Sequence, residues 1–105
     1  MPVVKDRVLE DLEGRPIQVA VDGATKDLRL FELLRYRIAS LPVQTAEDAR
    51  VGARVVRALV RALREGKDEV ELEREELDWV RARLPLMQLS VELFASVDGA
   101  LRGEG

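Results

Sequence analysis

The sequence predicts an α+β fold in which a β-hairpin, or a small three-stranded sheet, packs against three to four helices. Residues 17–21 and 26–30 read as strands on either side of Asp22-Gly23, a strong signal for a tight hairpin turn. Residues 45–66 repeat apolar side chains every three or four positions, which is typical of a helix with one buried face. With 105 residues, 47% of them apolar, the chain 1–105 is expected to form a single domain with its own core.

The remaining elements before the long helix follow in order. Residues 2–14 are mixed and indicate a short strand or an extended arm that ends at a glycine. In the hairpin, Ile17, Val19 and Val21 alternate with polar or small residues, as in a half-buried strand. After the return strand, apolar residues at helical spacing predict a helix from about residue 30 to 40, which Pro42 ends.

Beyond the long helix, residues 69–73 alternate charged and apolar side chains, which indicates a strand that could join the hairpin as its third member. Residues 73–84 predict a third helix, with Trp79 away from its apolar stripe. Pro85 is expected to be the first residue of a fourth helix that continues to about Leu101. Apolar residues lie on two sides of this last helix, so we expect it to have neighbours on both.

The helix at 45–66 is the most distinctive segment of the chain. Thr45 is a good N-cap residue, and Gly66 stands where a helix often ends in a left-handed glycine. Arginines recur at helical spacing on the side opposite the apolar stripe, within an arc of about 80°. We call this group the arginine ridge, and its members are Arg50, Arg54, Arg57, Arg61 and Arg64.

Three interpretations of the arginine ridge are open. Guanidinium groups bind carboxylates and phosphates through paired N–H donors, so an acidic protein surface and a nucleic acid are both candidates. Eight acidic residues follow within positions 65–78, so the ridge could also pair within the molecule or between two subunits. The absence of interleaved aromatic residues makes a nucleic-acid site the weaker of the external alternatives.

Two further residues are candidates for partner binding. Trp79 is either packed under a neighbouring element or held out as an interface anchor. Leu93 lies on the apolar last helix, which is either a central core helix or the seam of an oligomer.

Composition excludes most enzyme and metal chemistry from our expectations. The chain has no cysteine and no histidine, which removes thiolate chemistry, the commonest general base and the commonest metal ligands. The acidic segment lacks the spacing of a calcium loop, and no nucleophile or nucleotide-binding motif occurs. We therefore expect no enzyme activity, no cofactor and no metal. The longest apolar runs are too short for a signal peptide or a membrane span, so a cytoplasmic location is expected.

The order of the motifs resembles that of small phage and prophage proteins of about this length. The segments that carry the resemblance are VLEDLEGRPIQVAVDGATKDLRLFELL and DEVELEREELDWVRARLP, although Glu73 replaces the usual serine or threonine after VEL. Members of that group with a known role are assembly chaperones, virion connectors or regulators that bind a host protein. The expected function is a non-enzymatic protein–protein interaction module, phage-derived and oligomeric. The alternative is a nucleic-acid-associated regulator that uses the arginine ridge.

Overall fold

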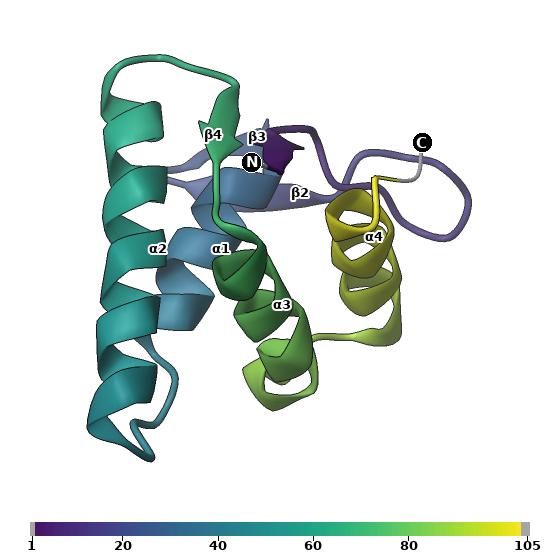
Figure 1. The fold of residues 1–105 in the computed structure, drawn as a ribbon. Coiled ribbons are helices and arrows are strands. Elements are labelled where there is room, and N and C mark those ends of the chain that lie inside the picture. The colour runs from purple at the N-terminus through teal and green to yellow at the C-terminus, as the bar shows by residue number, and fades with distance from the viewer. Residues whose placement is uncertain (1, 104–105) are drawn as a thin grey trace.

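The computed structural model describes residues 2–103 and confirms the α+β fold. These residues form four helices and two small antiparallel sheets of two strands each (Figure 1). In chain order the elements are β1 (Val3–Lys5), β2 (Gln18–Val21), β3 (Ala24–Asp27), α1 (Leu30–Ala39), α2 (Ala46–Arg64), β4 (Glu69–Glu71), α3 (Arg74–Arg83), the 3₁₀ turn η1 (Leu84–Met87) and α4 (Val91–Leu101).

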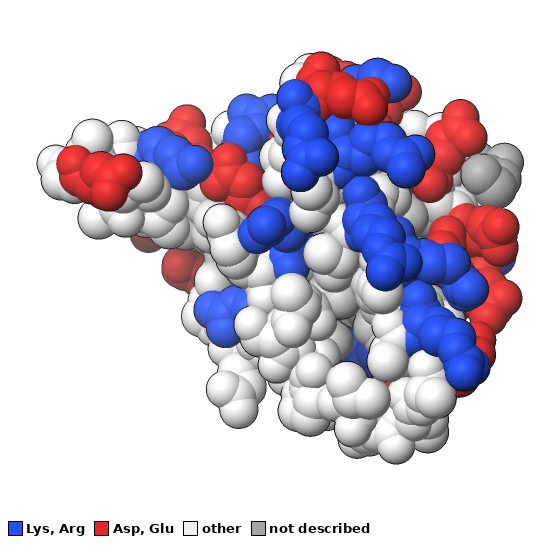
Figure 2. Space-filling model, turned by 90° about the vertical axis from the view of Figure 1, so that its left-hand side faces the viewer, with Lys and Arg blue, Asp and Glu red and all other residues white. Residues whose placement is uncertain are grey.

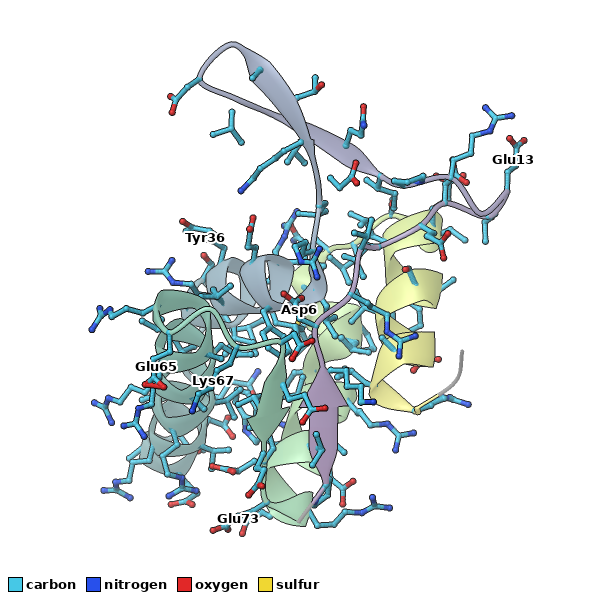
Figure 3. The ribbon with its side chains drawn as sticks, turned by 90° about the horizontal axis from the view of Figure 1, so that it is seen from above. Asp6, Glu13, Tyr36, Glu65, Lys67 and Glu73 are labelled. Atoms are coloured by element: carbon cyan, nitrogen blue, oxygen red, sulfur yellow. The ribbon has the colours of Figure 1, made fainter. Side chains whose placement is uncertain are left out.

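The predicted hairpin is present as β2 and β3, with Val21 paired to Ala24 across the turn, but its return strand spans Ala24–Asp27 and not residues 26–30. Asp22 and Gly23 both have positive φ angles, 50° and 81°, as the tightest hairpin turns require. The hairpin extends away from the helices (Figure 3), and Lys26 ties it to α1 through an ion pair of 2.9 Å with Glu32.

The three-stranded sheet that the sequence allowed is wrong. β4 pairs with β1 instead of the hairpin, and Val4 stands opposite Val70. Both valines are buried in the core, whereas most hairpin residues are exposed. β4 therefore pairs with β1, because both strands place a valine in the core.

The predicted start of the last helix at Pro85 is also wrong. Pro85 lies in the 3₁₀ turn η1, and Gln88 then adopts a left-handed conformation with a φ of 55° that ends any helical path. α4 begins only after Ser90, whose side chain accepts a hydrogen bond of 3.2 Å from the Leu93 N–H. The local cap at Ser90 therefore sets the helix start, and the apolar periodicity upstream does not.

The core lies between the four helices, with α1 packed along α2 (Figure 1). The apolar stripe of α2 is buried as its spacing predicts, and both predicted end signals are present. Thr45 accepts a hydrogen bond from the Asp48 N–H, and Gly66 has a φ of 69°. Several large side chains are fully buried, among them Leu9, Leu30, Phe31, Val55, Leu59, Val80, Leu84 and Val97.

Asp6 connects the end of β1 to the start of α1, which has no side-chain cap of its own. Its carboxylate accepts a hydrogen bond of 3.0 Å from the Phe31 N–H and one of 3.2 Å from the Arg29 Nε–H (Figure 3). The N-terminal segment thus provides the cap that the helix sequence lacks.

We predict opposite effects for two glycine-to-alanine changes. Gly66→Ala should lower the free energy of unfolding by about 1 kcal/mol, because a Cβ is strained at the positive φ of this helix end. Gly99→Ala should raise it by up to about 1 kcal/mol, because Gly99 is inside α4 and, apart from its chain neighbours and the backbone of its own helix, no heavy atom lies within 4 Å of the new methyl group. Urea denaturation followed by circular dichroism measures both, and a Gly66→Ala variant as stable as the wild type would contradict the left-handed helix end.

Candidate functional site

An apolar groove of about 450 Å³ lies where the C-terminal ends of α1 and α3 meet the N-terminal end of α2. Val43, in the loop before α2, and Leu86, in η1, line the groove and are 67% and 55% exposed. Exposed large apolar side chains that gather in a concave surface are typical of binding sites. The principal apolar lining residues are Ile38, Leu41, Val43, Val56, Trp79 and Leu86.

Trp79 forms part of the groove wall and packs on α2 at Gly52. A Cβ added to Gly52 would lie 3.1 Å from Cη2 of the Trp79 ring and 3.8 Å from Ile38. The glycine therefore lets the indole approach the α2 backbone closely, which explains a residue that otherwise weakens a helix interior. Of the two roles expected for Trp79, the structure places it half-buried under a neighbouring helix, at the edge of a groove.

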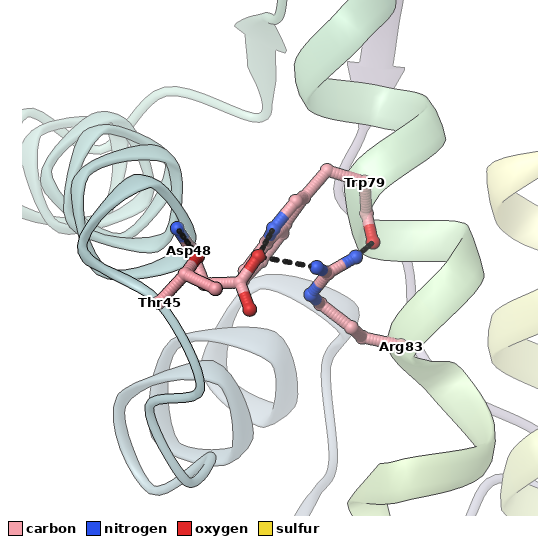
Figure 4. Close-up of polar contacts among 4 residues, drawn as sticks. All are labelled: Thr45, Asp48, Trp79 and Arg83. Carbon is pink, nitrogen blue, oxygen red and sulfur yellow. Dashed lines mark hydrogen bonds and ion pairs between the residues drawn. The ribbon is translucent and has the colours of Figure 1, made fainter.

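Asp48 and Arg83 complete the contact between α2 and α3 (Figure 4). One oxygen of the Asp48 carboxylate accepts hydrogen bonds from the Trp79 Nε1–H, at 3.3 Å, and from Arg83 Nη2, at 2.5 Å. The Arg83 guanidinium also lies 4.3 Å from the centroid of the Trp79 ring and donates to the Trp79 carbonyl. This arginine and aspartate satisfy each other, so they leave no unpaired charge in the groove.

The arginine ridge is exposed along its whole length on the outer face of α2. Figure 2 shows Lys and Arg side chains in a line beside a strip of acidic ones, with a wide uncharged area below them. Arg54 forms an ion pair of 3.4 Å with Glu76 of α3, and Arg50 forms one of 3.5 Å with Glu47 of its own helix. Within residues 2–103, no acidic side chain pairs with Arg57, Arg61 or Arg64.

Ion pairs within the described residues therefore involve two of the five ridge arginines, Arg50 and Arg54. Of the eight acidic residues at positions 65–78, Glu76 is the one that contacts it, and others pair with cations elsewhere. In the described part of the chain, Asp68, Glu71 and Glu75 form no side-chain hydrogen bond or ion pair. Both the basic and the acidic strips are thus available to other molecules.

The groove and the ridge share a border on α2. Ala53 lines the groove and also the shallow hollow between Arg50, Arg54 and Arg57. A bound molecule that fills the groove and continues along α2 therefore meets the ridge directly. The sequence indicated the ridge and Trp79 but missed the groove, because two stretches far apart in the chain, residues 38–56 and 79–86, form it.

Leu93, the candidate residue for self-association, is half-buried and packs against the core. The most exposed large apolar side chain of α4 is Val91, at 76%. Val97 and Leu101 are buried as well. Most of the apolar side chains of the last helix therefore pack against other parts of the same molecule.

The described residues carry no group of three or more acidic side chains placed to hold a metal ion. No helix among residues 2–103 is long and apolar enough to cross a bilayer. Comparisons of the chain with protein-family models, with curated proteins and with solved structures find no match. The resemblance to phage and prophage proteins stays a prediction.

We predict that Gly52→Ala displaces the Trp79 ring. Although alanine favours a helix, the crowded methyl group should make this variant about 1–2 kcal/mol less stable than the Gly99→Ala variant described above. Trp79 is the single tryptophan of the chain, so its fluorescence reports the movement directly. The emission spectrum should change in Gly52→Ala and stay unchanged in Gly99→Ala; an unchanged spectrum in both variants would show that the ring does not depend on Gly52.

Proposed function

We propose that this chain is a non-enzymatic protein-binding module that holds an acidic partner against the outer face of α2. The observation that carries the proposal is that three arginines of α2, Arg57, Arg61 and Arg64, have no acidic partner among residues 2–103 and follow an apolar groove along the same helix. Charged surfaces bordering an apolar pocket are the usual composition of a protein-recognition site. Roles in assembly or regulation, as in the phage proteins that the sequence resembles, belong to this proposal.

The extent of the ridge favours a protein over a nucleic acid. Arg57 and Arg64 are seven residues apart on α2, so the unpaired cations span about 10 Å of helix. A polyanion that continues past either end meets acidic residues, Glu47 in the first turn of α2 and Glu65 directly after its last. Few phosphates can be neutralised under these conditions, and affinity for nucleic acid depends on their number.

A nucleic-acid-associated regulator is the second candidate, and one observation favours it. Tyr36 on α1 is 64% exposed, and the Arg35 guanidinium lies 4.6 Å from the centroid of its ring. Exposed aromatic rings beside arginines can stack with bases. The side chain projects from the helix into solvent (Figure 3).

Direct binding measurements separate the two candidates. Fluorescence anisotropy at low salt compares a labelled helical peptide of glutamate and alanine with labelled duplex DNA, single-stranded DNA and RNA. We expect salt-sensitive binding of the acidic peptide and weaker binding of all three nucleic acids. Changing Arg57, Arg61 and Arg64 together to glutamine should weaken peptide binding about tenfold or more.

The control removes the same charge elsewhere. Arg15, Arg74 and Arg102 are exposed arginines on other segments, each paired with a neighbouring acid, and their change to glutamine should leave peptide binding nearly unchanged. Micromolar or tighter binding of DNA or RNA that the ridge variant loses would establish the nucleic-acid regulator instead.

A further inference from the structure

We infer that the apolar groove is the specificity pocket of this surface, and that it takes a large apolar side chain from an acidic segment of another protein. The inference rests on the proposed function and adds the residue type that the partner must carry. The partner segment would place a leucine, methionine or phenylalanine in the groove while its acidic residues contact Arg57, Arg61 and Arg64.

The chemistry of the groove selects an apolar side chain. Its volume of about 450 Å³ is within the range of clefts that bind small ligands, so it has room for a large apolar side chain. Val43 and Leu86 are more than half exposed in the free protein, so an apolar occupant would remove them from water. Asp48 and Arg83 bind each other, so a charged ligand gains no unpaired partner there.

The border at Ala53 links this pocket to the ridge in a defined geometry. Along α2, Arg57, Arg61 and Arg64 lie four, eight and eleven residues after Ala53, or about 6, 12 and 17 Å along the helix axis. A partner helix lying along α2 would therefore carry its apolar anchor about one turn before the first of three acidic positions.

The acidic strip of a second copy of this chain does not match this requirement. Its unpaired acids are Asp68, Glu71 and Glu75, but the large apolar residues next to them, Val70 and Leu72, are 8% and 3% exposed. They belong to the core and cannot enter a groove on another molecule. This strip of a second copy is therefore not the occupant, and we infer a segment of a different protein, in which exposed acids and an exposed apolar residue occur together at the spacing of the groove and the ridge.

Three helical peptides of equal length test the inference. The first carries a leucine one turn before three acidic positions at helical spacing, the second replaces the leucine with alanine, and the third replaces the acids with glutamine. Because Trp79 lines the groove and is the only tryptophan, its fluorescence reports filling of the groove. We expect the first peptide to bind about tenfold or more tightly than either of the others and to change the Trp79 emission.

A matched pair of variants places the leucine in the groove. Ala82 is exposed on α3 and lines the groove, so Ala82→Leu should place a larger side chain in the groove without disturbing the core and should reduce the advantage of leucine over alanine in the peptide. Ala95 is exposed on α4 and does not line the groove, so Ala95→Leu should leave the affinities of all three peptides unchanged.

The outcomes distinguish the pocket from the ridge. If the leucine and alanine peptides bind equally well and both depend on the ridge, the pocket inference is overturned and the proposed function stands. If the leucine peptide binds equally well with glutamines in place of its acids, the acidic partner is overturned and the pocket stands. Absence of binding by all three overturns both. A dimer in sedimentation experiments that Ala82→Leu dissociates would show that a second copy occupies the groove, which also overturns the inference.

Discussion

The contact between Trp79 and Gly52 is the constraint on which the candidate site depends. It lets an aromatic ring of α3 approach the backbone of α2, and the indole N–H then reaches the carboxylate of Asp48. The same ring forms a wall of the apolar groove and supports the Arg83 guanidinium. A residue with any side chain at position 52 would move the ring, and the groove would change with it.

Features that short segments determine by themselves could be predicted from the sequence. The turn at Asp22-Gly23, the cap at Thr45 and the left-handed end at Gly66 each depend on a few adjacent residues, and all are present. Capping also explains the main local error. Ser90 fixes the start of α4, whereas the apolar periodicity suggested a longer helix beginning at Pro85.

Features that depend on distant segments could not be predicted in the same way. The helical spacing of arginines identified the ridge, but its pairing depended on the position of α3, and Arg54 alone among the ridge contacts one of the acids at positions 65–78. The groove required two distant stretches, residues 38–56 and 79–86, to come together, so no local pattern indicated it. A glycine inside a strongly helical segment was the one available signal, and it shows only that some side chain approaches closely.

The pairing of β1 with β4 has a consequence for how the chain reaches its structure during synthesis. Val4 leaves the ribosome before its partner Val70, which is made 66 residues later, after α1 and α2. Closing a loop of that length carries a large entropic cost, so this pairing is expected to form late in folding. Until it forms, the hydrogen-bonding edge of β4 is open to strands from other chains, and β1 is the strand that later covers that edge.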